Sequence, residues 1–329
     1  MDSLYTMNKY TYYEEKRKGR PNMIFDAHCD VLMKLYLEPG SGAFQSKGSL
    51  HITYPQLIQS SSKIQLFAIY IPSYLKPGQR FQAALEMVNI FHNEILKSNP
   101  KMKFVTSKKD IERLSEGEIG AMLTLEGIEA VEEDLTKLEI LYRLGVRSVG
   151  LTWNWANAAA DGALEPRGGG LTNFGEEIVS FLNKKRLWTD VSHLCEKAFW
   201  DVMDSAEYPI ASHSNAYSIC PKPRNLKNEQ IEAIIKKNSV MGITFVPPFL
   251  NKKGTAEISD VVRHIEHVCS LGGEDHIGFG SDFDGITETV QGLSSYIQYD
   301  NLINTLQRYY SERQVEKFLF QNFFKRLPD

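Results

Sequence analysis

The stretch MIFDAHCDVL, residues 23–32, ends an apolar run with a histidine and an aspartate two positions apart, His28 and Asp30. Side chains two apart on a β-strand point to the same face, so the imidazole and the carboxylate would lie side by side. Such a pair can bind a metal ion. By itself the His-x-Asp pattern is weak evidence, because polar residues often end strands, and it requires partners elsewhere in the chain.

Residues of suitable chemistry follow other short apolar runs. Glu126 ends the run LTLE, and His193 ends DVSH. His213 lies in ASHS, and Asp282 lies in GSDFDG. A lone histidine at the end of a strand is more often structural than ligating. Several ends that all carry His, Asp or Glu predict a metal centre, because neutral imidazoles and carboxylates suit zinc, manganese, iron or cobalt.

The size of this residue set also bears on the number of metal ions. It holds more ligands than one tetrahedral ion needs, which indicates two ions. Glu126 is the natural bridge, since a carboxylate can join two ions about 3.5–4 Å apart. His28 and Asp30 would complete one site, and His193 and His213 the other. A water between two cations loses a proton far more readily than bulk water, so a bridging hydroxide would be the nucleophile.

These residues need a scaffold that brings distant chain segments together. The strand candidates are eight apolar runs, at residues 24–28, 64–71, 120–126, 146–152, 187–193, 209–213, 239–246 and 276–282. Helical spacing appears between them and again at 312–327. This alternation predicts an α/β fold with a single (β/α)8 TIM barrel of the metal-dependent hydrolase type, with an open doubly wound sheet as the alternative. In a barrel the strand ends meet at one mouth, where active sites lie.

Length and composition are those of a globular protein, with 329 residues, of which 42% are hydrophobic and 24% are charged. We expect residues 1–22 to form a loosely ordered leader, because they are polar and lack a hydrophobic period, and residues 23–329 to form the catalytic barrel. The net charge of −4 without a long basic run gives no case for nucleic-acid binding. The chain has no secretory signal and no apolar stretch of about 18 residues, so we expect a cytoplasmic protein without membrane contact.

The long motifs around these residues resemble those of the membrane dipeptidase (renal dipeptidase) family, two-zinc peptidases with an amidohydrolase-like barrel. The resemblance runs from about Met23 to the C-terminal helix and rests on FDAHCDVL, LTLEGIEAV, LTWNWANAAADG, GGGLTNFGEEIVSFLNKKRLWTDVSH, PIASHSNAYSICPKPRNLKNEQI and HIGFGSDFDG. It implies a zinc-dependent dipeptidase that hydrolyses free dipeptides, including those with a C-terminal D-residue. It is also compatible with a homodimer. It implies two Zn²⁺ ions per chain, bound by His28, Asp30, Glu126, His193 and His213.

The resemblance further implies that Asp282 is the catalytic acid and base, beside the bridging Glu126, and that Arg224 in KPRNL holds the free carboxylate of the substrate. A carboxylate on the last strand can take a proton from the bridging water and return it to the leaving amine. A guanidinium is the side-chain group best suited to a carboxylate, because it can donate two parallel hydrogen bonds to it. The alternative for Arg224 is a surface side chain that caps the following helix.

The chain departs from the family pattern after the fourth strand. Many members carry a histidine there that is thought to steady the developing oxyanion, and Trp153 takes its place in LTWNWAN. Asn154 could donate a hydrogen bond instead, or one zinc could act alone. Trp153 could line the substrate pocket or pack in the core. His264 and His267, three apart on a predicted helix, are expected on the solvent face of that helix.

A related binuclear amidohydrolase acting on another amide, ester or lactone is the alternative function. Such relatives usually carry His-x-His on the first strand and often a metal-bridging lysine after the fourth. This chain has His28 and Asp30 in the first position and no lysine in GLTWNW, which argues against that alternative. A barrel that only binds a ligand is a further alternative, and the complete ligand set argues against it.

Overall fold

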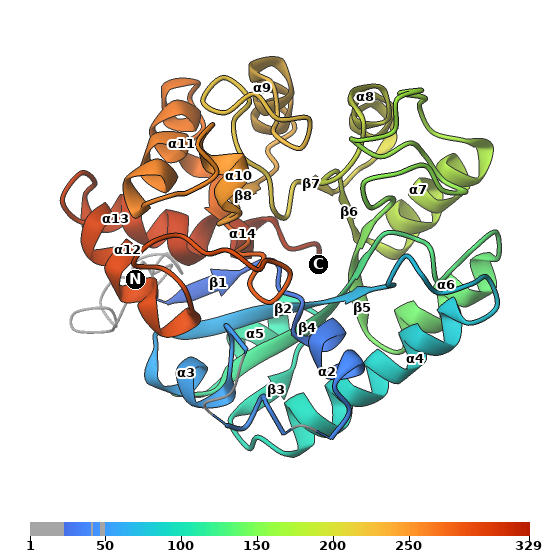
Figure 1. Ribbon diagram of the computed structural model, residues 1–329, viewed down its shortest axis with the longest axis horizontal. Coiled ribbons are helices and arrows are strands. Elements are labelled where there is room, and N and C mark those ends of the chain that lie inside the picture. Colours follow the sequence, from blue (N-terminus) through green and yellow to red (C-terminus); the bar gives the residue numbers. More distant parts are fainter. Residues whose placement is uncertain (1–22, 41, 47–49) are drawn as a thin grey trace, which may run out of the picture.

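The computed structural model describes residues 23–40, 42–46 and 50–329, so the leader expected at 1–22 lies outside the described residues. In the described part, eight parallel strands form a nearly closed barrel with helices around it (Figure 1). Their order is β7-β6-β5-β4-β2-β1-β9-β8, and a parallel bridge between Ala211 and Met241 joins the two ends. The predicted (β/α)8 barrel is confirmed, and the open doubly wound sheet is wrong.

Each predicted strand run contains or overlaps one barrel strand. The barrel strands are β1 (Ile24–Asp26), β2 (Ser62–Tyr70), β4 (Ile119–Glu126), β5 (Val146–Gly150), β6 (Trp188–Asp190), β7 (Pro209–Ile210), β8 (Met241–Ile243) and β9 (Ile277–Phe279). A further short strand, β3 (Met102–Phe104), was not predicted and pairs with the first residues of β4.

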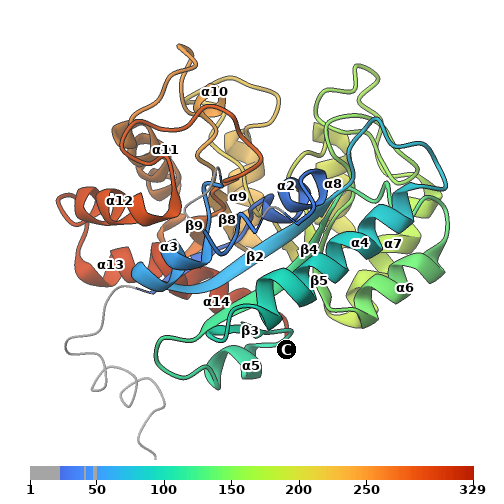
Figure 2. The same ribbon diagram turned by 60° about the horizontal axis from the view of Figure 1, so that its bottom comes forward.

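Helices connect the strands and lie outside them, as a second view confirms (Figure 2). The α-helices are α2 (Val31–Leu37), α3 (Tyr54–Gln59), α4 (Arg80–Ile90), α5 (Lys108–Glu112), α6 (Leu135–Arg143), α7 (Asn173–Lys185), α8 (Glu196–Ser205), α9 (Asn228–Lys236), α10 (Pro247–Leu250), α11 (Ile258–Ser270), α12 (Tyr299–Leu306), α13 (Glu312–Glu316) and α14 (Asn322–Arg326). Two short π-helices are η1 (Phe91–Lys97) and η4 (Lys317–Gln321), and two short 3₁₀-helices are η2 (Glu274–His276) and η3 (Tyr296–Gln298). None of the helices in the described ranges is long and apolar enough to cross a membrane.

The end of the chain closes the bottom of the barrel, opposite the mouth. Helices α13, η4 and α14 follow one another without a break and match the C-terminal helix predicted at 312–327. Phe323 stacks on Phe25 of β1 with ring centroids 5.3 Å apart. A Cβ at Gly278 of β9 would lie 2.3 Å from the Phe323 ring, so only glycine allows this close approach. Metal ligands are therefore expected at the other end of the barrel.

The position of His264 on α11 differs from the expectation. Its side chain is fully buried rather than solvent-exposed. The backbone N–H of Ala216 donates to His264 Nδ1 at 3.0 Å, and Nε2 lies 2.9 Å from the carbonyl oxygen of Leu250. The solvent-face prediction was wrong for this residue, because it lies on the same face of α11 as the buried Val261 and Val268. His264 thus ties α11 to the segment that follows β7.

Candidate metal centre

The residues predicted as metal ligands meet at the mouth of the barrel. Their order along the chain is His28 and Asp30 after β1, Glu126 at the end of β4, His193 after β6, and His213 after β7. All five side chains are buried. Glu126 follows Met122 and Thr124 on one face of β4, and Met122 packs in the cluster inside the barrel. The period of two therefore directs the Glu126 carboxylate inward.

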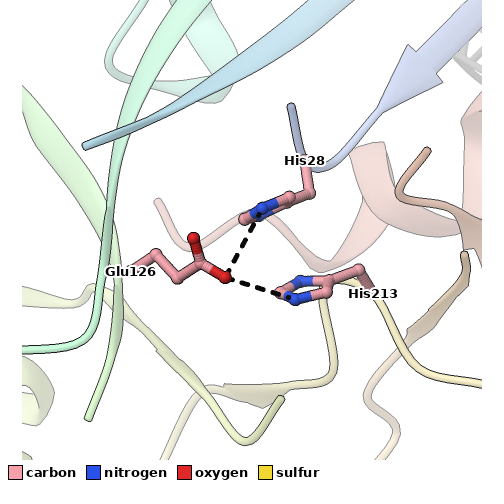
Figure 3. A group of neighbouring side chains, drawn as sticks. All are labelled: His28, Glu126 and His213. Carbon is pink, nitrogen blue, oxygen red and sulfur yellow. Dashed lines mark ion pairs between the residues drawn. The ribbon is translucent and has the colours of Figure 1, made fainter. Parts of the chain in front are cut away.

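Glu126 Oε1 lies between three imidazoles. It is 2.9 Å from His193 Nε2, 3.5 Å from His213 Nε2 and 3.7 Å from His28 Nε2. Figure 3 shows His28 and His213 pointing toward the Glu126 carboxylate from different strand ends. One carboxylate thus contacts ligands of both predicted sites, as a bridge requires.

Hydrogen bonds on the far side of two rings determine where their protons lie. His193 Nδ1 is 2.9 Å from Asn154 Oδ1, an acceptor, so Nδ1 carries the proton. Ser212 Oγ donates to Asp190 and therefore accepts from His213 Nδ1 at 2.7 Å. Both Nε2 atoms are then lone-pair acceptors, only 2.8 Å apart.

The space between these atoms fits a cation. The Nε2 atoms of two imidazoles, whose ring protons lie on the far Nδ1 atoms, converge there with the carboxylate oxygen of Glu126. His28 Nε2 is buried beside them, 3.7 Å from the same carboxylate oxygen. Buried acceptors that face one another are costly unless a donor or a cation joins them. Nitrogen and carboxylate ligands suit zinc and similar divalent ions.

A second group surrounds His28 on its other side. Its Nε2 is 3.4 Å from Asp30 Oδ2 and 4.0 Å from Asp282 Oδ1. These three residues form one candidate metal-binding group, and His28, Glu126 and His213 form another. Gly285 makes room for both aspartates, since a Cβ there would lie 2.2 Å from Asp30 Oδ2 and 2.5 Å from Asp282 Oδ1.

The centre holds an excess of negative charge. Burial raises the pKa of Glu126 well above its usual value, and the neighbouring aspartates act in the same direction. Burial also raises the pKa of Asp282 to about 7, with Asp30 contributing and His28 opposing. Burial disfavours the charged form of His28, but Glu126 and Asp30 outweigh it and raise its pKa to about 10. Divalent cations would relieve this repulsion among buried carboxylates.

Two residues of the centre have left-handed backbone conformations. His193 has φ 70° and Asp282 has φ 62°. Non-glycine residues rarely adopt this region, and such strain often accompanies a functional site.

Sequence reasoning missed the Asp190–Ser212 pair that orients His213. The signal was present, because a buried aspartate in the run LWTDVSH is unusual for a barrel strand.

The remaining predicted site residues also lie around the mouth. Arg224 is buried, and its Nη2 donates to the carbonyl oxygen of His213 at 3.3 Å, so it is not a surface residue. Asn154 contacts His193 through its side-chain oxygen. The Trp153 ring lies 6.2 Å from that of His193 and 5.3 Å from that of Tyr70. Tyr70 was not predicted, although it follows the inward-facing Ile64 and Leu66 on β2.

Comparisons with known proteins agree with this architecture. A sequence model of the family described as membrane dipeptidase (peptidase family M19) matches residues 18–329. An uncharacterised protein of Klebsiella pneumoniae from the pqqA 5′ region is 35% identical over 266 residues, which are 77% of this chain and 98% of that protein. An uncharacterised dipeptidase of Schizosaccharomyces pombe is 30% identical over 304 residues, 85% of this chain and 73% of that protein.

A solved structure shows the same likeness in three dimensions. It is a metallo peptidase from Rhodobacter sphaeroides, liganded with a phosphinate mimic of the dipeptide L-Ala-D-Ala. It has 26% sequence identity and a TM-score of 0.88, and the match covers 94% of this chain and 99% of that one. Because the family model spans nearly the whole sequence, the chain belongs to the membrane dipeptidase family, peptidase family M19, and is a dipeptidase of this metallopeptidase family.

Proposed function

We propose that this protein is a zinc-dependent dipeptidase that holds two Zn²⁺ ions and hydrolyses free dipeptides, including those with a C-terminal D-residue. The observation that carries the proposal is the convergence of His193 Nε2, His213 Nε2 and Glu126 Oε1 on one point. The phosphinate mimic of L-Ala-D-Ala in the Rhodobacter sphaeroides relative supports the substrate class.

The distances support the following ligand roles. His28 and Asp30 would hold one ion, His193 and His213 the other, and Glu126 would bridge them. When bound, the two ions supply an activated water nucleophile and polarise the scissile carbonyl. Asn154 orients His193, and Ser212 orients His213, so that each presents its Nε2 lone pair.

Asp282 moves the proton. Its side chain is 16% exposed, whereas those of His28 and Asp30 are 2% and 5% exposed. Of these three groups it is therefore the most accessible to a substrate in the mouth. Asp282 accepts the proton that the attacking water loses and donates it to the amine nitrogen as the peptide C–N bond breaks. The products are two free amino acids.

Arg224 recognises the substrate carboxylate. Burial lowers its pKa to about 10, against the effect of Asp282 and Glu126, so the guanidinium stays charged at neutral pH. Its Nε is buried without a hydrogen-bond partner in the described ranges. A carboxylate at the mouth would accept from such free donors. This recognition limits cleavage to peptides whose C-terminus lies one residue beyond the scissile bond.

A turnover assay tests the proposed function. Zinc-loaded protein is incubated with free L,L- and L,D-dipeptides, matched N-blocked dipeptides and a tripeptide, and released amino acids are quantified. We expect cleavage of the free dipeptides only, together with two zinc ions per chain by elemental analysis. If no peptide is cleaved while two metals are bound, the dipeptidase proposal fails and the same centre should be assayed with other amides, esters and lactones.

A further inference from the structure

A pocket of about 660 Å³ lies beside the metal centre. Its wall on the side of the centre includes the rings of Tyr70 and Trp153. Tyr70 ends β2 and is the register partner of Glu126 on β4. Trp153 follows β5 and faces His193. Tyr70 and Trp153 are therefore shared by the pocket lining and the surroundings of the metal centre.

The pocket is across the barrel mouth from Arg224. Arg224 belongs to the segment after β7, whereas the pocket lies over the ends of β2, β4 and β5. In the order of the eight barrel strands, β2 is four places from β7 in either direction, so the two strands are opposite. A dipeptide whose carboxylate is at Arg224 thus directs its N-terminal residue toward the pocket.

The pocket lining carries two more carboxylates than cations. Its acidic residues are Glu129, Glu132, Glu133 and Asp134, and its basic residues are Arg80 and Lys137. Lys137 is already paired with Glu132, and Arg80 Nε donates to the carbonyl oxygen of Leu75 at 3.0 Å.

Glu129 and Glu133 differ in their surroundings. Glu129 Oε1 accepts from Asn157 Nδ2 at 3.1 Å, and the buried carboxylate is further stabilised by the backbone N–H groups of Trp153 and of Glu129 itself, so it contributes negative charge to the pocket wall. The Glu133 side chain is exposed, and within the described residues it forms no ion pair or hydrogen bond. An incoming positive charge would find in Glu133 a carboxylate that the described residues leave without an ion-pair partner.

The pocket also offers apolar and aromatic surface. Ile71 and Ile128 line it together with Trp155, whose side chain is about half exposed. Lysine and arginine lay their aliphatic stems along apolar surface and place the charged end in water or over an aromatic face. The volume is far larger than an alanine side chain needs and falls in the usual range for small-molecule sites.

We propose that this pocket binds the side chain of the N-terminal residue of the dipeptide and selects a basic one, lysine or arginine. This inference rests on the proposed function. The aromatic and aliphatic wall holds the stem, and the carboxylates of Glu129 and Glu133 attract the charge. Because the pocket is open to solvent at Glu133, the attraction is screened by salt.

The test compares side chains that differ only in charge. We measure kcat/KM for L-Lys-L-Ala and for L-norleucyl-L-Ala, which lacks the ammonium group, and for L-Ala-L-Lys, which carries the charge at the other position. We expect L-Lys-L-Ala to exceed the norleucyl peptide by roughly tenfold at low salt, and the ratio to fall as salt is raised. L-Ala-L-Lys should show no such gain over L-Ala-L-norleucine.

A charge-reversal variant then assigns the effect to the pocket. In Glu133→Lys the preference for the lysyl peptide over the norleucyl peptide should fall about fivefold or more. The matched control is Glu116→Lys, an exposed acid just before β4 and so at the opposite end of the barrel. The control should keep the wild-type preference.

The outcomes separate this inference from the proposed function. If dipeptides are cleaved with equal kcat/KM for the lysyl and norleucyl forms, or if Glu133→Lys leaves the preference unchanged, the pocket assignment is wrong and the dipeptidase activity stands. If no free dipeptide is cleaved at all, both are overturned, because there is then no N-terminal residue to accommodate.

Discussion

Asp282 differs from the other carboxylates of the metal centre in its greater exposure and in its left-handed backbone. We predict that Asp282→Asn lowers kcat about 10²- to 10⁴-fold, because asparagine cannot accept and return the proton. Zinc content should remain near the wild-type value, since the ligands assigned to the ions stay in place. Steady-state kinetics on L-Ala-D-Ala and elemental analysis of the same sample measure both quantities.

The matched substitution at a proposed ligand gives the contrast. Asp30→Asn should lower the zinc content as well as the activity, because Asp30 lies 3.4 Å from His28 in the same candidate group. Full activity in Asp282→Asn would rule out Asp282 as the acid and base.

Arg224 gives a second prediction at the level of single residues. In Arg224→Gln, kcat/KM for free dipeptides should fall roughly 100-fold through a rise in KM, because the substrate carboxylate would lose its charged partner in a buried site. The loss should be under about threefold for dipeptide amides, which have no carboxylate. Lys222→Gln removes a positive charge from the same loop and is the control. An equal loss for acids and amides would contradict carboxylate recognition.

Among the elements, the C-terminal helix stabilises the barrel without contributing to the centre. Phe323 of α14 stacks on Phe25, and Trp188 Nε1 donates to the carbonyl oxygen of Arg326 at 2.9 Å. Phe323→Ala should cost about 3–5 kcal/mol of unfolding free energy, because it leaves a cavity at the barrel bottom. Chemical denaturation measures this loss, and KM should be unchanged.

Phe324→Ala is the comparison within the same helix. Phe324 is only partly buried and stacks on Phe320 at the margin of the cluster. Its removal should cost clearly less than that of Phe323. If both variants lose the same stability, the closure of the barrel bottom does not depend on the Phe323–Phe25 contact.

His264 on helix α11 should make the free energy of unfolding depend on pH. Burial lowers the pKa of His264 to about 4, and the positive charges of Arg263 and His267 lower it further. The hydrogen bond to the Leu250 carbonyl and the charge of Asp260 act in the opposite direction. In the unfolded chain this histidine has its ordinary pKa of about 6.5. Between about pH 4 and about pH 6.5 the unfolded chain therefore binds more protons than the folded protein. The stability of the metal-free protein should therefore fall by up to about 3 kcal/mol as the pH drops from about 6.5 to about 4.

The variant His264→Gln isolates this effect. Glutamine cannot be protonated, so the fall in unfolding free energy across this pH window should be smaller by about the same amount. Urea denaturation at several pH values, with chelator present, measures it. His267→Gln on the same helix is the control. Identical pH profiles for the wild type and His264→Gln would contradict a neutral buried imidazole.

At the level of the whole molecule, the bound metal ions should contribute to the stability of the barrel mouth. The proposed ligands lie at the ends of four of the eight barrel strands in the described chain, β1, β4, β6 and β7. Chelation would leave buried carboxylates close together without a cation. Removing the metal should lower Tm by several degrees, and adding zinc at about 1,000 times its Kd should restore about 4 kcal/mol. A Tm that does not respond to chelator or zinc would contradict this coupling.

The sequence predicted the eight strands and the ligand types because both are local features. Apolar runs of strand length and their alternation with helical patterns need no knowledge of the rest of the chain.

His28 and Asp30 were expected side by side, and they are. The reason differs, since β1 ends at Asp26 and both Phe25 and Ala27 already pack inside the barrel. Strict alternation would have placed His28 on the outer face.

What the sequence by itself determined was the barrel, its family and the residue types gathered at its mouth. Only the tertiary structure decided how the ligands are oriented and what surrounds them. The hydrogen bond from His193 to Asn154 joins segments 39 positions apart, and that from Ser212 to Asp190 joins the ends of neighbouring strands. No periodic pattern encodes such contacts, because they depend on where loops meet in space. The same holds for the pocket, whose aromatic wall and carboxylates come from three different strand ends.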